Sequence, residues 1–249
     1  MMPDSRQLLE VCEATWPAAA HFRVGPFTLR DGQGGGKRVS AATLDGDGLP
    51  GDEDRHRAEE RMAALGQPLL FQVRPGQDAF DRQLDAAGYR VVDPTRAYVI
   101  ETARLTDIAI PRVTTFCIWE PLAIQVDLWA AGGIGPERLA VMIRAECPRT
   151  AILGRIEDSP GASAYVGLHA GIAMLHALEV TPAKRRKGLA RWVMRQAAAW
   201  AEAQGARHLA VLCTAGNVGA NALYQSMGFA PVDGYHYRIK SEPTPGARP

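Results

Sequence analysis

The sequence predicts an α/β protein of the α+β type, built as two related halves. Short apolar strands alternate with amphipathic helices along the chain, three strands follow one another between residues 150 and 180, and one segment of the first half recurs in the second. With 249 residues, the chain is long enough to bury a substantial core.

The first hundred residues mix strands and helices. The apolar run "PFTLR" at 26–30 leads into the glycine-rich segment 31–40, which predicts a strand, a turn and a second strand. Residues 45–66 pass from turn-forming residues into an amphipathic helix. A buried strand, a short helix and another strand are then expected at 68–73, 78–89 and 96–102. These elements define an N-terminal domain at 1–105.

A second domain is expected at 106–240. It opens with a strand that Pro121 ends, followed by helical spacing with a glycine-rich break. The three successive strands have an antiparallel meander pattern, with turns at "SPGA" (159–162) and at Gly171. The remaining elements are listed in order: strands at 150–158, 163–171 and 172–180, a helix from the loop after Val180 to about Gly205, a strand at 208–214, a short helix ending at Gly228, a strand at 236–240 and a flexible tail at 241–249.

An internal repeat supports the two-half organisation. When residues 76–93 are aligned with residues 216–233, an offset of 228 − 88 = 140 residues, two glycines, one valine and one aspartate coincide. Each segment follows a buried strand and precedes another strand, so the same supersecondary unit is predicted twice. The alternative is an unrelated N-terminal cap domain.

Composition narrows the functional classes. A net charge of +1 argues against broad electrostatic binding of nucleic acid or of a membrane, so any basic site must be local. The four cysteines form no CxxC pair, which predicts neither a zinc site nor a disulfide framework. The first residues carry charges where a signal peptide needs an apolar run, and no stretch is long and apolar enough to span a membrane. A cytoplasmic protein without a metal is expected.

The segment "EVTPAKRRKGLARWVM" at 179–194 contains the most informative local pattern. A basic, glycine-containing loop lies directly before a predicted helix, whose first backbone N–H groups favour an anion. Lys184 and its three basic neighbours add positive charge, and Gly188 allows close approach of a ligand. Neither the P-loop pattern nor GxGxxG is present. A pyrophosphate fits this chemistry, whereas the simplest alternative is an exposed basic loop.

The surrounding segments resemble a known family. After the strand that ends at Val180, the order R-x-x-G-x-A is followed by a long helix, a strand and N-x-x-A-x-x-L-Y-x-x-x-G-F at 217–229. This arrangement, over about residues 112–240, resembles the acetyl-CoA-binding core of the GNAT superfamily of N-acetyltransferases. The resemblance implies a mixed, mostly antiparallel sheet flanked by helices, in which the fourth and fifth strands splay apart to admit the pantetheine arm.

The resemblance also implies a set of cofactor-binding residues. The main chain of the fourth strand would hold the pantetheine arm, the basic loop would cradle the pyrophosphate, and the second motif would lie beside the arm. The residues so implied are Leu178, Glu179, Val180, Arg185, Arg186, Lys187, Gly188, Leu189, Ala190, Asn217, Ala220 and Tyr224. Asn217 is equally well placed to be a helix N-cap, and both roles are compatible.

Two catalytic residues are expected. By resemblance, Tyr224 protonates the departing thiolate, while its alternative role is to pack its ring on the sheet. Strand alternation places His176 on one face with Met174, Leu178 and Val180, which makes it a candidate base; a core histidine is the alternative. Glu179 and Glu120 are weaker candidates for the base. Cys213 is expected to be a buried strand residue.

These expectations combine into one functional hypothesis. The chain is expected to transfer acetyl directly from acetyl-CoA to a primary amine, on a small-molecule acceptor, with no metal and as a monomer or homodimer. The N-terminal half holds Gln77 and Leu84 where the second motif has asparagine and tyrosine, so it is expected to be a degenerate GNAT-like unit. The alternatives are a CoA-binding regulatory pseudoenzyme and a nucleic-acid-binding module.

Overall fold

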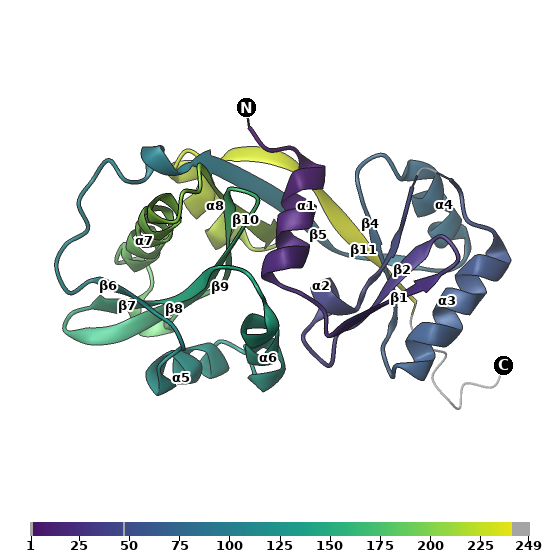
Figure 1. Ribbon diagram of the computed structural model, residues 1–249, viewed down its shortest axis with the longest axis horizontal. Helices are drawn as coiled ribbons and strands as arrows, with labels where there is room; N and C mark the ends of the chain where they lie inside the picture. Colours follow the sequence, from purple (N-terminus) through teal and green to yellow (C-terminus); the bar gives the residue numbers. More distant parts are fainter. Residues whose placement is uncertain (1, 47, 241–249) are drawn as a thin grey trace. The chain divides into compact units, whose positions relative to one another are not determined.

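The computed structural model describes residues 2–46 and 48–240, so the expected tail at 241–249 lies outside the described residues (Figure 1). The chain forms two compact units. Within the described residues, unit 1 comprises 2–17, 96–213 and 217–233, and unit 2 comprises 18–95, 214–216 and 234–240. This division differs from the expected boundary after residue 105, because the first helix belongs to unit 1 and the last strand ends in unit 2.

Unit 2 has a small mixed sheet with two main helices. Strands β1, β2 and β3 pair antiparallel in that order, and β3 pairs parallel with β4. The strand expected within 31–40 instead follows that segment, because residues 37–40 form a short helix. The bounds are β1 Ala20–Val24, β2 Phe27–Asp31, α2 Lys37–Ser40, β3 Ala42–Leu44, α3 Asp52–Ala64, β4 Leu69–Val73 and α4 Asp78–Ala86. Its core contains the rings of Phe27, Phe71, Phe80 and Tyr89, which pack against one another in tilted and edge-on arrangements.

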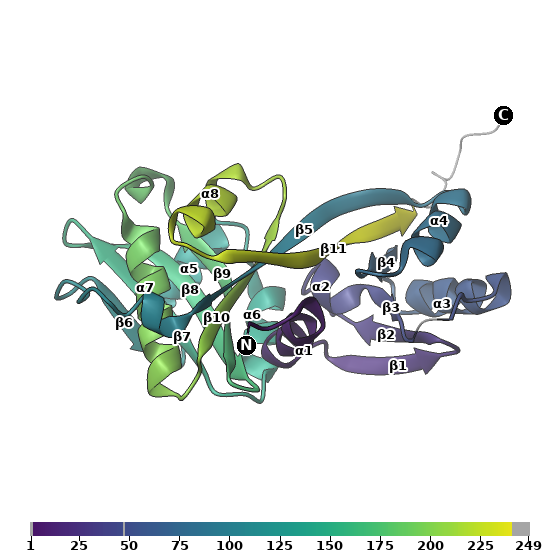
Figure 2. The same ribbon diagram turned by 90° about the horizontal axis from the view of Figure 1, so that it is seen from above.

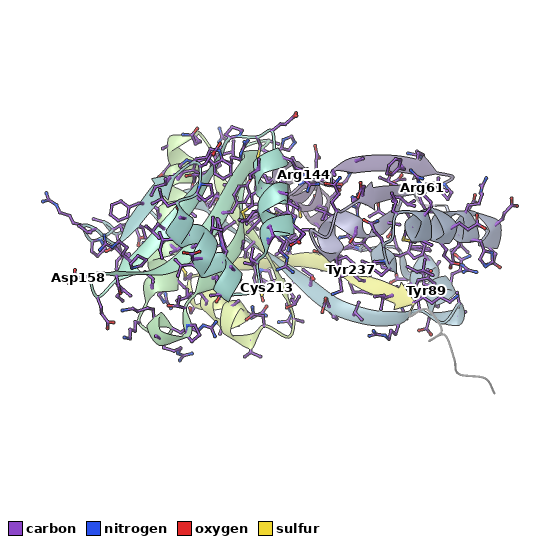
Figure 3. All side chains as sticks on the ribbon, turned by 90° about the horizontal axis from the view of Figure 1, so that it is seen from below. Arg61, Tyr89, Arg144, Asp158, Cys213 and Tyr237 are labelled. Carbon is purple, nitrogen blue, oxygen red and sulfur yellow. The ribbon has the colours of Figure 1, made fainter. Side chains whose placement is uncertain are left out.

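Unit 1 contains the predicted meander. Strands β7, β8 and β9 pair antiparallel, and β6 pairs with the outer edge of β7. The first turn of the meander lies at Glu157 and Asp158, both with positive φ, and not at 159–162; Figure 3 shows Asp158 at the tip of this hairpin. The bounds are α1 Ser5–Thr15, η1 Thr102–Arg104, β6 Thr115–Ile118, α5 Ala123–Ala131, α6 Pro136–Arg144, β7 Arg149–Ile156, β8 Ser159–His169, β9 Ile172–Val180, η2 Pro182–Lys184, α7 Leu189–Ala203, β10 His208–Thr214 and α8 Val218–Ser226.

The two faces of the unit 1 sheet are covered by different helices (Figures 1 and 2). Helix α7 buries Val193, Ala197 and neighbouring apolar side chains against β7–β10, and α8 adds Tyr224 to the same cluster. Helix α1 packs Leu8 and Val11 on the opposite face, against Met174 of β9. Helix α5 also contacts β8 and β9. The sheet therefore has an α7/α8 face and an α1 face.

The internal repeat is present as structure. Adding 140 to the bounds of α4 (78–86) gives 218–226, the bounds of α8. The helix ends also agree, because the Tyr89 amide donates to the Leu84 carbonyl at 3.0 Å and the Phe229 amide donates to the Tyr224 carbonyl at 3.1 Å. Each helix follows a strand that pairs in parallel with the strand before it. Two related halves are thereby confirmed.

The last strand of each repeat completes the sheet of the other. Strand β5 (Arg90–Glu101) follows α4 but ends in unit 1, where it lies next to β10. Strand β11 (Ala230–Lys240) follows α8 but ends in unit 2, where it pairs antiparallel with β4 from His236↔Val73 to Lys240↔Leu69. The strand order is β1-β2-β3-β4-β11 in unit 2 and β5-β10-β9-β8-β7-β6 in unit 1. Both strands are longer than the sequence pattern predicted.

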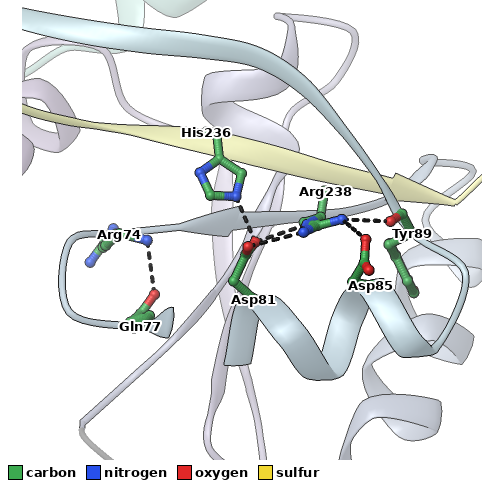
Figure 4. A network of polar contacts seen from close by, with 7 residues as sticks. All are labelled: Arg74, Gln77, Asp81, Asp85, Tyr89, His236 and Arg238. Atoms are coloured by element: carbon green, nitrogen blue, oxygen red, sulfur yellow. Dashed lines mark hydrogen bonds and ion pairs between the residues drawn. The ribbon is translucent and has the colours of Figure 1, made fainter. Parts of the chain in front are cut away.

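Ion pairs and hydrogen bonds join the end of β11 to α4 in unit 2 (Figure 4). Arg238 is 6% exposed, and its guanidinium donates to Asp81 through Nε at 2.8 Å and through Nη2 at 2.9 Å. Its Nη1 reaches Asp85 at 2.5 Å and donates to the Tyr89 carbonyl at 2.9 Å. His236 Nε2 lies 2.6 Å from Asp81 Oδ1. The arginine lowers the pKa of Asp81 to about 2 against the opposing effect of burial, and the histidine adds to the lowering.

Candidate active site

The loop between β9 and α7 offers a row of backbone donors. Gly188 is the N-cap of α7, with φ +85°, and apart from Gly188 and its two chain neighbours no described atom lies within 4 Å of the position that a Cβ would take. In the part of the chain that the structure describes, no acceptor receives a hydrogen bond from the backbone N–H groups of residues 186–190. These amides start a 15-residue helix, so the positive end of its dipole adds to their attraction for an anion.

The side chains of the same loop are less available than its amides. Lys184 and Lys187 contact Glu157 of the β7–β8 hairpin at 2.9 and 2.8 Å. Arg185 donates through Nε to the Val180 carbonyl at 2.9 Å and through Nη2 to Glu179 at 3.0 Å. Of the four loop cations, Arg186 is the one that forms no ion pair with the residues described here. The structure therefore presents one unpaired cation and five amides to an incoming anion.

The pairing of β9 with β10 ends just before the residues expected to hold the pantetheine arm. Parallel pairing of β9 with β10 runs from Ile172↔His208 to Leu175↔Val211, whereas β9 continues to Val180. At this point β9 bulges, because Ala177 has φ +52° and the register with β8 shifts between Ser163 and Tyr165. The predicted splaying of these two strands is present. It leaves one edge of β9 without a partner from β10 over residues 176–180.

The bulge corrects the expected facing of the side chains on β9. Leu178 and Val180 pack with the cluster on the α7/α8 face, whereas Met174 packs on the α1 face. His176 lies on the α1 face, where Thr15 Oγ1 is 2.8 Å from its Nε2 and the Trp16 ring is 5.1 Å away. The expectation that His176 shares a face with Leu178 and Val180 is wrong, since the extra residue in the bulge reverses the alternation.

His176 has the surroundings of a core histidine. It is 4% exposed, and the Thr15 hydroxyl that it contacts also donates to the Val11 carbonyl at 2.7 Å. Because a hydroxyl has one proton to donate, the His176 Nε2 must be the donor to Thr15. That nitrogen is therefore protonated and occupied, which removes it as a proton acceptor.

Tyr224 lies in an aromatic cluster beneath α8. It is 6% exposed, and its ring centroid is 5.7 Å from the ring of Tyr98 and 5.7 Å from that of Phe229. Burial raises the pKa of its phenol above the ordinary value of 10, and the nearby Cys213 and Tyr98 raise it further. The hydroxyl is therefore protonated at neutral pH, as a proton donor must be.

The second motif forms the N-terminus of α8 as its sequence predicts. The Asn217 side chain accepts from the Ala220 amide at 3.1 Å, so its N-cap role is confirmed. Cys213 is 6% exposed in the core of unit 1, which confirms its interpretation as a buried strand residue (Figure 3). Glu120 lies exposed after β6. Among the described residues, there is no group of three or more His, Cys, Asp and Glu side chains that could hold a metal.

Three residues of this region gave no signal in the sequence. Tyr98 comes from β5, the exchanged strand, and its hydroxyl donates to Asn221 Oδ1 at 2.8 Å. Glu157 binds two loop lysines from a hairpin tip. Trp129 of α5 donates its indole N–H to the Ala177 carbonyl at 2.8 Å. A tryptophan in a helix is ordinarily predicted to be a core residue, so Trp129 gave no functional signal. Tyr98 and Glu157 contact elements that are distant in the sequence, and such contacts leave no local motif.

Comparison with known proteins agrees with this geometry. Residues 144–229 match the model of the acetyltransferase (GNAT) family. The uncharacterized N-acetyltransferase YobR of Bacillus subtilis (strain 168) is 27% identical over 249 residues, which cover 96% of this chain and all of that protein. Among solved structures, a GCN5-related N-acetyltransferase from Kribbella flavida has a TM-score of 0.66 at 17% identity, with 98% of each chain covered. A tandem GNAT protein from the clavulanic acid biosynthesis pathway has a TM-score of 0.59 at 14% identity, covering 82% of this chain and 76% of that one.

The fold, the two motifs and the family match define the class of protein. The chain is an acyltransferase with a mixed sheet, a diverging pair of parallel strands and, at the start of the helix between them, a loop whose amides have no acceptor among the described residues. Its residues 144–229 match the GNAT acetyltransferase family, and its fold of two related halves is similar to that of a tandem GNAT protein. None of its described helices has the length and apolar character needed to cross a lipid bilayer.

Proposed function

We propose that the protein transfers the acetyl group of acetyl-CoA directly to a primary amine of a small-molecule acceptor. The observation that supports this most strongly is the row of amides at residues 186–190, which have no acceptor among the described residues. Residues 186–188 are exposed, and the first N–H groups of a helix have no acceptor within it, so this row of donors is open to an anionic ligand at the start of α7. When bound, acetyl-CoA supplies an activated thioester carbonyl.

The remaining binding residues follow from this placement. Residues 185–190 and Arg186 in particular would hold the pyrophosphate, and the free edge at Leu178, Glu179 and Val180 would pair with the pantetheine amides as a strand does. Asn217 and Ala220 would border the same arm at the start of α8. The open space around Gly188 fits a diphosphate lying against the loop.

The chemistry needs few groups from the protein. The neutral amine nitrogen attacks the thioester carbonyl, the new C–N bond replaces the C–S bond, and a backbone N–H of the β9 edge stabilises the oxyanion. Tyr224 donates its phenolic proton to the departing thiolate and regains a proton from the solvent. The amine loses its proton to Glu179 or to water, since His176 donates its Nε2 proton to Thr15. Positioning supplies much of the rate enhancement.

Calorimetry on the purified protein tests the cofactor site. Acetyl-CoA should bind with micromolar-range affinity, and Gly188→Trp should abolish binding because the ring would occupy the space before the amides. Gly205→Trp is the matched control, since Gly205 follows the other end of α7 with φ +81° and equally open surroundings. It should cost similar stability and leave binding intact. Full affinity in folded Gly188→Trp would defeat the assignment.

A further inference from the structure

The segment of β9 that would face the thioester has an unusual conformation. Ala177 lies at φ +52°, a left-handed conformation that a non-glycine residue adopts only when its surroundings enforce it. The parallel partner β10 has stopped pairing two residues earlier, at Leu175. Neither the local sequence nor β10 therefore accounts for the shape of this segment.

Helix α5 supplies the missing restraint. The indole N–H of Trp129, which is fully buried, donates to the Ala177 carbonyl at 2.8 Å. One turn later, Gly132 ends the helix so close to the strand that a Cβ there would lie 2.4 Å from Glu179 Cγ. The same helix thus contacts the bulge and the residue two positions after it.

Helix α1 holds the residue before the bulge. Thr15 bonds to His176 at 2.8 Å, and the Trp16 ring packs on the same imidazole. Residues 176–179 are therefore fixed from the α1 face of the sheet while their outer edge stays open. The only hydrogen bond to the backbone of the bulge residue from a side chain of the described chain is that of Trp129.

We infer that Trp129 is a positioning residue for acetyl transfer, whose indole N–H holds the β9 bulge in the conformation that keeps the 178–180 edge open to the pantetheine arm and aligned for the oxyanion. This inference rests on the proposed function. Trp129 touches no reacting atom and acts through the backbone of Ala177. Small displacements of such a backbone donor cost activity steeply.

A double-mutant cycle separates this role from simple core packing. Trp129→Phe keeps an aromatic ring and removes the N–H, and it should lower kcat by between about 10-fold and 100-fold with a smaller change in the KM for acetyl-CoA. Ala177→Gly alone is the reference for the cycle, because glycine adopts positive φ without strain. Combined with Ala177→Gly, Trp129→Phe should cost several-fold less than it does alone. Trp200→Phe, in a partly buried position on α7, is the control and should be near wild type.

Hydrogen exchange supplies a readout that needs no acceptor. The Thr181 amide donates to the Gly161 carbonyl at 2.9 Å just after the bulge, so a peptide covering 176–181 should exchange faster in Trp129→Phe and recover in the double variant. The inference would be overturned if Trp129→Phe lowered kcat equally with and without Ala177→Gly. It would also be overturned if folded Trp129→Phe kept wild-type hydrogen exchange and turnover. If the wild-type protein fails to release CoA with every amine tested, the proposed function is wrong. The exchange data would still decide the role of Trp129.

Discussion

At the scale of single residues, the environment of Tyr224 determines what its hydroxyl can do. Burial is the largest cause of its raised pKa, followed by Cys213 and Tyr98. Because the pKa is raised above 10, the phenol keeps its proton throughout the neutral range and ionises only at higher pH than a free tyrosine. The phenol is therefore in the form that can donate a proton to a thiolate at neutral pH, and burial makes it a weaker acid than a free tyrosine.

Replacing this hydroxyl should affect turnover and not binding. Tyr224→Phe should lower kcat by about 100-fold, the lower end of what a positioned acid contributes, with the affinity for acetyl-CoA within twofold of wild type. Stopped-flow detection of the released thiol measures the first quantity, and calorimetry the second. Tyr98→Phe is the matched control, because its ring neighbours Tyr224 while its hydroxyl is bonded to Asn221. Equal turnover in Tyr224→Phe would remove the acid role.

The sequence could identify some of these residues and not others. Tyr224 and Asn217 lie in a contiguous motif, so their places on α8 were predictable, and the N-cap role of Asn217 follows from its residue type. The partner of the loop lysines was not predictable, since Glu157 lies on a hairpin of the preceding strands. Lys187 and then Lys184 lower the pKa of Glu157 to about 2, so this carboxylate stays charged beside the loop at neutral pH.

At the scale of elements, strands were easier to predict than their irregularities. The alternation in 172–180 correctly predicted β9, but a period of two cannot reveal an inserted residue. One bulge at Ala177 therefore placed His176 on a different face from Leu178 and Val180. By contrast, α4 and α8 were predicted with the correct offset, because each ends in a glycine and an aromatic residue that the same helix termination requires.

Because of the ion pair between α4 and β11, the free energy of unfolding should fall in the acid range. The folded-state pKa of Asp81 is about 2, below the ordinary 3.8, so folding favours the ionised form. The resulting stabilisation is fully present above about pH 4 and is lost as the pH falls toward 2. Asp81→Asn should therefore flatten the fall of the unfolding free energy between pH 4 and 2, as measured by urea titration. Above pH 5 the two proteins should show parallel pH dependence. An unchanged acid slope in the variant would contradict the role of Asp81.

At the scale of the whole molecule, the exchanged strands decide which pieces of the chain are complete. Residues 1–105 hold α1 and β5, whose packing partners β8, β9 and β10 lie later in the chain, and they lack β11. The later piece of the chain, from residue 106 on, lacks β5, and its strand β11 is without its partner β4. The two related halves were predictable from the internal repeat, whereas the division between the units and the exchange were not, because strand order depends on pairings that no local pattern encodes.

Two separately produced fragments should therefore need each other. Residues 1–105 and 106–249, cut in the segment between η1 and β6, should each be poorly folded alone and should form a stable 1:1 complex when co-expressed. Circular dichroism and size-exclusion chromatography measure both outcomes, and acetyl-CoA binding reports recovery of the site. Two fragments that each unfold cooperatively as monomers would contradict the exchange of β5 and β11.

The order in which the ribosome releases the chain gives the exchanged strands a further consequence. Unit 2 contributes residues 18–95 first, and the strand that covers the edge of β4 is translated only after the whole of unit 1's second repeat up to α8. That edge stays open while the residues between β4 and β11 are synthesised, and an open edge is a template for unwanted pairing with other nascent chains. The yield of folded enzyme in cells should thus depend on slow translation or on chaperones more than the stability of the folded protein would suggest.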